Sequence, residues 1–287
     1  MKKVIGVLIF IQILLFFVLH SPHQKDLVLV TCDVGQGDAH IILYHDVQIL
    51  VDAGEKKDVV TCLGKYMPQT DHHIEIAIMT HPEFDHAGGF NAVLERYEIG
   101  MLFANRVDNS TDSFRLLKNK VGDLTIPVIQ PKDNDELKID DLVIHFTHPS
   151  TDLVGTGGKI LLGEETPALN LNDYSLTFRL SQGGVTALYT GDISPEQISN
   201  MLARGRIGHV NLLKIPHHGS KNGVTNQLLS DTTPDISVIS VGKKNKFGHP
   251  DQEVINLLSE YKTQVYRTDL MGDVAFKNEN GKLVFQP

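Results

Sequence analysis

The chain has 287 residues, of which 41% are hydrophobic and 21% charged. This balance is typical of globular proteins and excludes a disordered or collagen-like chain. Lys and Arg number 26 against 35 Asp and Glu, and the net charge of −9 argues against a general nucleic-acid-binding surface, since phosphate binding needs positive charge. With two Cys and fourteen His, a bound metal is expected to have His and carboxylate ligands rather than thiolates.

The N-terminus carries an apolar segment. Lys2 and Lys3 precede the run 4–19, a pattern typical of an export signal. Neither a small-residue cleavage site nor a lipobox cysteine follows, which favours an uncleaved signal-anchor helix with the remainder outside the cytoplasm. A cleaved signal, giving a secreted protein, and a buried N-terminal helix are the alternatives. We expect 1–25 to be the anchor or export segment and 26–287 the functional domain. Removing residues 1–24 removes two lysines and no acidic residue, so the net charge of the remainder is −11.

The remainder of the chain alternates strand and helix patterns. Short β-branched or apolar runs predict strands over 26–32, 41–44, 48–51, 74–79, 99–103, 126–129, 142–146, 175–180, 185–189, 210–215 and 236–241, and three more close the chain. Helical patterns cover 58–67, 87–97, 195–203, 222–230 and 252–261. Gly183-Gly184 predicts a hairpin, and 147–172 a long loop. This order predicts one α/β domain in which helices cover two packed sheets.

Potential metal ligands concentrate directly after predicted strands. Segment 80–89 (THPEFDHAGG) holds His81, Glu83, Asp85 and His86, and its glycine pair permits a tight turn into the next helix. A solvated acidic turn whose histidines cap that helix is the alternative interpretation. Three further pieces also follow strands: Asp192, the pair His217-His218, and His249. Each alone is more often structural, but recurrence at four strand ends predicts convergence on one edge of the fold.

The motif His81-x-Glu83-x-Asp85-His86, with Asp192 and His218, resembles the metallo-β-lactamase signature. Four further motifs are similar to the extracellular hydrolase domain of the ComEC-type DNA-uptake competence proteins and its stand-alone relatives: DVGQGDA (33–39), DAG (52–54), HHGS (217–220) and FGHP (247–250). The resemblance covers 26–287. It implies a four-layer αββα sandwich, here preceded by one N-terminal hydrophobic helix, with a two-metal site along one edge and nuclease or phosphodiesterase activity.

Carried over to this sequence, the resemblance implies that His81 and residue 83 bind one divalent ion. It implies that Asp85, His86 and His218 bind the other, and that Asp192 bridges the two. Two such ions lower the pKa of water and hold the attacking and leaving oxygens.

Other residues are expected to support this site without binding metal. Asp52 ends an apolar strand and is expected to orient a ligand, and His217 is expected to lie beside the ligands. The glycines Gly35 and Gly37 are expected to bring backbone amides near the metals, with Asp38 in support.

Two departures from the family pattern affect the metals. Glu83 stands where the family has Asp or His, and its extra methylene either still reaches the metal or displaces one ion. Asn172 or Asp173 stands in place of a third histidine, and either is a candidate ligand. The first position is therefore poor in histidine and rich in oxygen, which favours Mn²⁺ over Zn²⁺, the alternative.

The predicted substrate is a phosphodiester. Lys243, Lys244 and Lys246 precede His249; the lysines attract phosphate, and His249 binds an oxyanion or protonates the leaving oxygen. In this hypothesis Asp85 and Asp192 hold the metals and orient the nucleophile. The substrate is DNA or a cell-wall polymer such as a phosphocholine or teichoic-acid linkage. No aromatic-basic stripe for single strands is evident.

Two other functions compete with this one. A carboxylic or lactam hydrolase would use the same scaffold, and Glu83 keeps open a metal-poor binding module that assists DNA uptake. Segment 155–159 (GTGGK) lacks the spacing of a phosphate loop. Cys32 and Cys62 are expected to be small core residues, with a disulfide outside the cytoplasm as the alternative. The sequence defines no oligomeric state.

Overall fold

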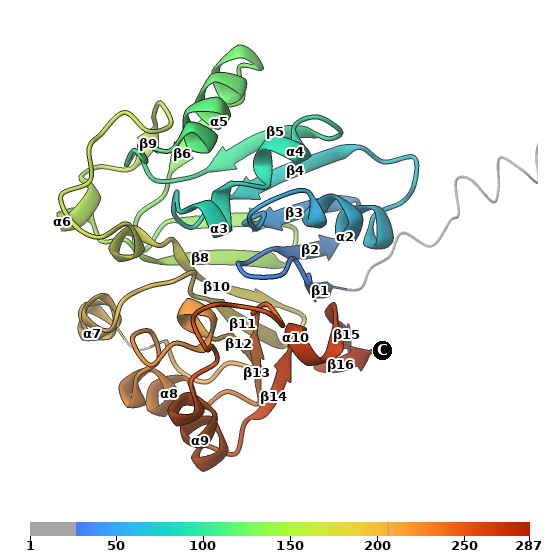
Figure 1. Cartoon of the computed structure of the whole chain (residues 1–287). Helices are drawn as coiled ribbons and strands as arrows, with labels where there is room; N and C mark the ends of the chain where they lie inside the picture. The colour runs from blue at the N-terminus through green and yellow to red at the C-terminus, as the bar shows by residue number, and fades with distance from the viewer. Residues whose placement is uncertain (1–26, 206) are drawn as a thin grey trace, which may run out of the picture.

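The computed structural model describes residues 27–205 and 207–287. Two β-sheets pack face to face in the middle of the molecule, and helices cover the outer face of each (Figure 1). The expected N-terminal helix and segment 1–25 lie outside the described residues. None of the described helices combines the length and the hydropathy that crossing a bilayer requires.

The first sheet has nine strands, and its central strands β3 to β6 run parallel. In spatial order the strands are β16 (Lys282–Gln286), β15 (Val274–Glu279), β1 (Val28–Thr31), β2 (His40–Tyr44), β3 (Val47–Val51), β4 (His73–Ile78), β5 (Glu98–Phe103), β6 (Val128–Gln130) and β9 (Gly158–Lys159).

The second sheet has seven strands, and β11 to β14 run parallel. Its order is β14 (Gln264–Arg267), β13 (Ile236–Ile239), β12 (Leu212–Lys214), β11 (Val185–Tyr189), β10 (Thr177–Gln182), β8 (Leu142–His148) and β7 (Glu136–Ile139). The expected hairpin is confirmed: β10 and β11 pair antiparallel, and Gly183 and Gly184 turn between them with φ of 54° and 84°, values that suit glycine.

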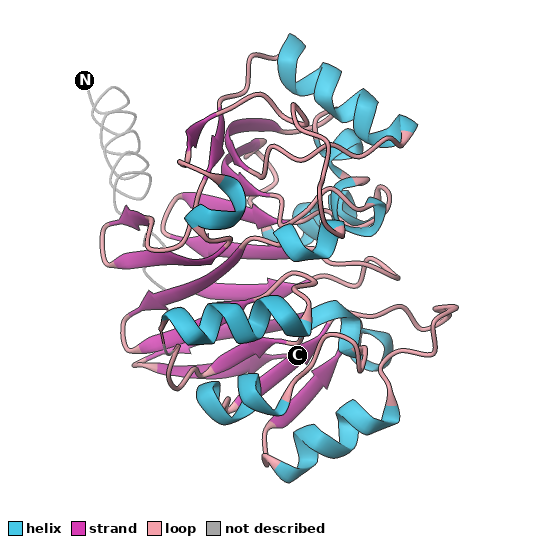
Figure 2. Ribbon diagram, turned by 90° about the vertical axis from the view of Figure 1, so that its left-hand side faces the viewer, coloured by secondary structure: helices cyan, strands magenta, loops and turns pink. Residues whose placement is uncertain are grey.

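Three apolar clusters account for the layers. One fills the space between the two sheets, and the other two lie between each sheet and its helices. Helices α2 (Asp58–Tyr66), α4 (Phe90–Val93) and α5 (Asp112–Asp123) cover the first sheet, and α7 (Pro195–Arg204), α8 (Asn226–Thr232) and α9 (Gln252–Glu260) cover the second. Figure 2 shows the strands between these helices. The predicted αββα sandwich is therefore confirmed.

Short helical turns complete the described elements. They are α3 (Phe84–Ala87), α6 (Thr151–Val154), α10 (Thr268–Met271) and two 3₁₀ turns, η1 (Leu171–Tyr174) and η2 (Pro216–Gly219). Segment 147–172, expected to be a loop, contains α6 and β9, and η1 begins at its end.

Some element predictions were wrong. The helix expected over 87–97 is not continuous: α3 ends at Ala87 and α4 spans only Phe90–Val93. Between them the Gly89 amide donates to the Gly54 carbonyl at 2.8 Å instead of continuing a helix. Helix α5 was not predicted, although Thr111 caps its N-terminus and the helix is amphipathic. The edge strand β7 was not predicted either. Helix α8 begins at Asn226 rather than 222, because Thr225 caps it there.

Cys32 and Cys62 form a disulfide that joins the loop after β1 to α2. Both residues are buried, as expected, but the expectation of two free core thiols was wrong. The loop after β1 packs against α2, and the two Cα atoms lie 6.0 Å apart, a normal separation for a disulfide.

Candidate metal centre

The candidate ligands gather where parallel strands of both sheets end. Asp52 follows β3, and segment 81–86 follows β4 in the first sheet; Asp192 follows β11, His218 follows β12, and His249 lies after β13 in the second. The carboxyl ends of parallel strands lie at one edge of each sheet, and packing the sheets face to face brings the two edges together.

Four side chains converge at this edge. The Nε2 atom of His218 lies 3.2 Å from Oδ2 of Asp85 and 3.3 Å from Oδ2 of Asp192. The Nε2 atom of His86 lies 3.3 Å from the same Asp192 oxygen. His81 forms a neighbouring group with His86 and Asp192, whose ligand atoms lie within 4.8 Å of one another. A second group, Asp85, His86 and His218, shares His86 with the first. Imidazoles and carboxylates in two overlapping groups form donor sets that suit divalent transition metals.

Hydrogen bonds to Asp52 and Thr80 orient two of these histidines. The Asp52 carboxylate accepts from the Thr80 amide and hydroxyl, both at 2.7 Å, and lies 2.8 Å from Nδ1 of His86. Since the Thr80 hydroxyl donates to Asp52, it can accept from Nδ1 of His81 at 3.0 Å. Both rings therefore direct Nε2 to the centre, the carboxylate–histidine arrangement that supports metal ligands.

The third histidine is oriented in the same way. Nδ1 of His218 lies 3.0 Å from the Ser240 carbonyl, which can only accept, so the proton is on Nδ1 and Nε2 faces Asp85 and Asp192. Within the described structure, Nε2 of His81 and of His86 are buried without a hydrogen-bond partner. Buried polar atoms are rarely left so, and a bound cation would satisfy both. The residues present therefore fit a metal ion.

The cluster stabilises positive charge. Burial alone would lower the pKa of His86 and of His218, but facing carboxylates, Asp192 first, outweigh burial and raise both pKa values well above the usual 6.5. Burial alone would raise the pKa of Asp192, but His218, His86 and Lys214 hold it well below the usual range. His81 differs, because burial lowers its pKa to about 3 and leaves the ring neutral.

Lys214 lies at the candidate centre and was not predicted from the sequence. It is fully buried on β12, and its ammonium contacts the Asp38 carboxylate, the Gly191 carbonyl at 2.9 Å and Oδ1 of Asp192 at 3.3 Å. The His217 amide also donates to Oδ1 of Asp192 at 3.2 Å, so Oδ2 is the oxygen that faces the histidines. A lone lysine inside an apolar strand was the available signal, since buried lysines are rare unless paired.

Asp38, predicted to support the site, lies among the candidate ligands: its carboxylate forms one group with Asp192 and His218 and another with Asp52 and His86. Its buried carboxylate contacts Lys214 and lies 3.3 Å from Nδ1 of His218. Burial alone would raise its pKa, but Lys214 and His218 hold it well below the usual range. The Asp38 amide donates to the Asp85 carbonyl at 3.1 Å, which ties the glycine-rich loop of 33–38 to the ligand segment.

Other predicted site residues lie near the centre but outside the metal-ligating groups. Glu83 precedes α3 and lines the same pocket, where burial and then Asp85 raise its pKa, yet it belongs to none of the ligand groups found among the described residues. Neither Asn172 nor Asp173 joins one; the Asp173 carboxylate instead accepts from the Ser194 hydroxyl at 2.5 Å.

The centre opens into a pocket of about 250 Å³. Its lining residues come from six segments of the chain: Gln36, Glu55, Glu83, Phe84, Asp85, Asp192, His217, His218, Phe247 and His249. His249 packs edge-on to His217, with ring centroids 6.1 Å apart, and Nδ1 lies 3.6 Å from an Asp251 oxygen. His249, the predicted proton donor, therefore lines the same pocket as Asp85, Asp192 and His218.

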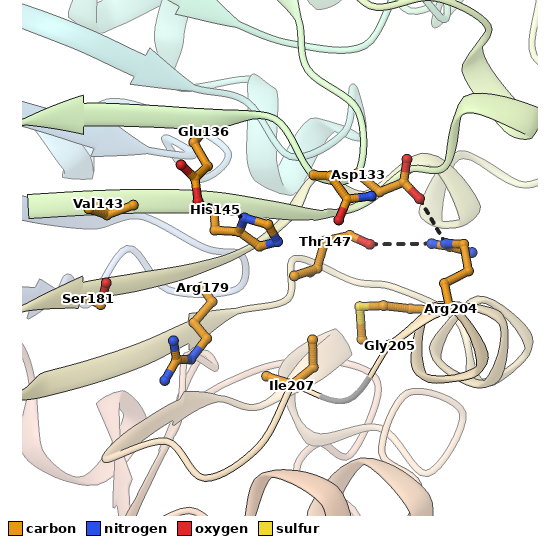
Figure 3. A pocket seen from close by; sticks show the side chains of 12 residues that line it. Asp133, Glu136, Val143, His145, Thr147, Arg179, Ser181, Arg204, Gly205 and Ile207 are labelled. Atoms are coloured by element: carbon orange, nitrogen blue, oxygen red, sulfur yellow. Dashed lines mark hydrogen bonds and ion pairs between the residues drawn. The ribbon is translucent and has the colours of Figure 1, made fainter.

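A separate pocket of about 420 Å³ lies beside β8, β10 and α7 (Figure 3). Arg204 is paired there with Asp133 at 3.0 Å and donates to the Thr147 carbonyl at 3.3 Å. This pocket contains none of the predicted site residues, and we place no reaction in it.

Comparison with solved structures identifies the fold. YhfI of Bacillus subtilis, a metallo-β-lactamase-fold protein, has a TM-score of 0.57 and 15% identity, over 88% of this chain and all of that chain. Igni18 of Ignicoccus hospitalis, described as a metallo hydrolase, has a TM-score of 0.55 and 14% identity, over 88% of this chain and all of that chain. CmlA of Streptomyces venezuelae, a diiron β-hydroxylase, has a TM-score of 0.51 and 14% identity, over 89% and 54%. The chain therefore has the metallo-β-lactamase fold, which serves more than one chemistry.

Sequence comparison finds homologues named for competence and recombination. ComE operon protein 3 of Bacillus subtilis is 25% identical over 91% of this chain, and Recombination protein 2 of Haemophilus influenzae is 27% identical over 93%. Competence protein ComA of Neisseria gonorrhoeae is 22% identical over 91%. The chain spans about a third of the length of these curated relatives. No family model matches the chain.

Proposed function

We propose that this protein is a metal-dependent hydrolase that cleaves phosphodiesters. The observation that carries the proposal is the convergence of Asp85, His86, Asp192 and His218, whose Nε2 and Oδ2 atoms approach to 3.2–3.3 Å at the floor of an open pocket. The homologues and the hydrolase among the structural neighbours support the class of reaction.

We propose two positions for divalent ions, Mn²⁺ or Zn²⁺, and these positions differ in metal affinity. Asp85, His86, Asp192 and His218 would hold the first; His81, Glu83 and Asp192 would hold the second. The second position is weaker in this proposal, because Glu83 lies outside the ligand groups and Lys214 and the His217 amide occupy Oδ1 of Asp192. Bound ions would lower the pKa of water and neutralise charge on a phosphate.

The protein's own residues supply the remainder of the mechanism. Asp85 and Asp192 fix the direction from which the nucleophile reaches phosphorus, and Lys214 holds the Asp192 carboxylate in one orientation. His249, on the pocket wall, donates a proton to the leaving oxygen. The exposed residues Lys243, Lys244 and Lys246 attract the anionic substrate to an otherwise acidic protein.

The test is metal content and activity of the purified full chain, stripped with chelator and reloaded with Mn²⁺ or Zn²⁺. We expect at least one ion per chain by elemental analysis and hydrolysis of bis-p-nitrophenyl phosphate. Asp192→Asn is expected to lower the metal content and to reduce the hydrolysis rate by about 100-fold. The control is Asp123→Asn, an exposed carboxylate at the end of α5. Hydrolysis of nitrocefin alone would establish a lactam hydrolase instead, and less than one ion per chain a binding module.

We also propose that the protein acts outside the cytoplasm, held at the membrane by segment 1–25 or secreted if that segment is cleaved. The Cys32–Cys62 disulfide supports this placement, because structural disulfides persist in oxidising compartments and are rare in the cytosol. Thiol labelling of cells after acid quenching tests it: we expect Cys32 and Cys62 to react only after reduction. Two free thiols in untreated cells would contradict an extracytoplasmic location.

A further inference from the structure

We propose that Phe84 and Phe247 form an aromatic mouth that selects phosphodiesters carrying a planar ring beside the phosphate, as nucleotides do. This inference rests on the proposed phosphodiesterase function and assigns its specificity. The two residues are 163 positions apart in the sequence, and both line the pocket that holds Asp85, Asp192 and His218.

Their exposure is unusual in this protein. Phe84 is 40% exposed and Phe247 67% exposed, and they are the only aromatic side chains among the exposed large hydrophobic residues of 27–205 and 207–287. The other described Phe and Tyr side chains are buried or partly buried. Single exposed hydrophobic residues are common on protein surfaces, but these two line one pocket, and nucleobases stack readily on such rings.

The loop that carries Phe247 is already ordered for binding. The Asn245 side-chain oxygen accepts from the amides of Phe247 at 3.1 Å and His249 at 3.0 Å, and its nitrogen donates to the carbonyls of Gly242 and His249 at 2.8 Å. The Phe247 ring lies nearly parallel to that of His249, with centroids 5.8 Å apart and 13° between the planes. One side of the mouth is therefore a preformed pair of rings that includes the proposed proton donor.

Phe84 is held on the ligand side of the mouth. It begins α3, one residue before Asp85, and its ring packs on Gly88, where an added Cβ would lie 2.7 Å from Cε2 of Phe84. The ring is therefore fixed next to the residue that is proposed to bind metal. A planar group entering with the phosphate meets a Phe84 or Phe247 ring beside the centre.

Three lysines beside Phe247 favour nucleic acid over a polyol-phosphate polymer. Lys243, Lys244 and Lys246 lie on the loop of Phe247, are exposed, and form no ion pair within the described part of the structure. No aromatic-basic stripe is evident in the sequence, but the fold brings Phe84 to the pocket beside the loop that carries Phe247 and the lysines. Rings on which bases stack and cations beside the backbone are the features by which proteins bind single strands. A glycerol-phosphate polymer has charge for the lysines but no ring for Phe84 and Phe247.

The test compares two oligomers of equal length and charge: oligothymidylate and an abasic sugar-phosphate oligomer. Binding to the full chain in chelator is measured by fluorescence anisotropy, and cleavage with Mn²⁺ is measured in parallel. We expect wild type to prefer oligothymidylate by about 10-fold or more in Kd and in KM. In the double variant Phe84→Ala/Phe247→Ala we expect the preference to fall below about 2-fold.

Two matched variants separate stacking from bulk hydrophobicity. Phe84→Tyr/Phe247→Tyr retains both rings and is expected to keep the preference, whereas Leu161→Ala removes an exposed apolar side chain (74%) outside the pocket and is expected to leave it unchanged. Equal binding of the two oligomers by wild type, or a preference that survives the double alanine variant, overturns the inference. Preferential binding without cleavage of either oligomer would support the aromatic mouth and contradict the proposed hydrolase.

Discussion

His148, at the end of β8, shows how one buried residue couples stability to pH. Its Nε2 donates to the Asp173 carbonyl at 2.8 Å, while Nδ1 is buried without a partner in the described structure. Protonating Nδ1 would bury an unpaired N–H, and burial accordingly lowers the pKa of His148 to about 4.

The sign of the resulting pH dependence follows from that shift. In the unfolded chain His148 takes up a proton near its ordinary pKa of 6.5, and in the folded protein only near 4. The unfolded state therefore binds more protons between these values, and this contribution to stability is lost as pH falls from 6.5 to 4. We expect it to reach about 3 kcal/mol.

Urea unfolding of wild type and His148→Gln at several pH values between 4.5 and 7 measures this contribution. The variant is expected to have a shallower dependence, by up to about 1.4 kcal/mol per pH unit. The exposed His72→Gln serves as control and is expected to follow wild type. Parallel curves for wild type and His148→Gln would show that His148 does not titrate in this way.

At the scale of elements, the loop after β1 illustrates how a glycine positions the site. Gly37 has φ of +118°, and a Cβ there would lie 2.1 Å from the Asp85 carbonyl oxygen. Gly35 also has a positive φ, +75°, but an added Cβ would meet nothing within 4 Å. The two glycines lie in the same loop, but only Gly37 packs against the backbone of the candidate ligand Asp85.

We therefore expect Gly37→Ala to lower the free energy of unfolding by about 2–3 kcal/mol and to weaken metal binding, because Asp85 must move. Gly35→Ala introduces only the left-handed penalty, about 1 kcal/mol, and is expected to leave metal affinity within about 2-fold. Urea denaturation and Mn²⁺ titration of both variants make the comparison. Equal metal affinity in the two variants would exclude a positioning role for Gly37.

The elements that the sequence revealed least well are those whose boundaries depend on close packing. Thr225 caps α8 at a boundary four residues from the predicted one. Between α3 and α4 the Gly89 amide donates to the carbonyl of Gly54, a residue far away in sequence. Helix α5 had readable local signals, in its Thr111 cap and amphipathic spacing, and the sequence analysis overlooked them.

For the whole molecule, the candidate metal centre joins the two halves of the sandwich. Asp85 and His86 follow β4 of the first sheet, whereas Asp192 and His218 follow β11 and β12 of the second. A ligand that binds only when these edges are in contact stabilises the folded state, by about 2.7 kcal/mol at a concentration 100 times its Kd.

We expect saturating Mn²⁺ to raise the Tm of the full chain by about 5–10 °C relative to chelator. Asp192→Asn removes a ligand from the second sheet and is expected to abolish most of this shift, whereas Asp123→Asn retains it. Differential scanning calorimetry gives both values. A Tm that does not respond to Mn²⁺ in wild type would contradict a metal centre that bridges the sheets.

Strand periodicity and the position of polar residues after strands are local properties. The two-sheet fold and the edge at which chemistry-bearing residues gather could therefore be predicted from the sequence. Which of those residues meet depends on the tertiary packing. It paired buried Lys214 with Asp38 and Asp192, set Glu83 outside the ligand groups, and brought Phe84 to the same pocket as Phe247. These contacts join residues far apart in the chain, and they depend on strand order and on the packing of one sheet against the other, which no local pattern encodes.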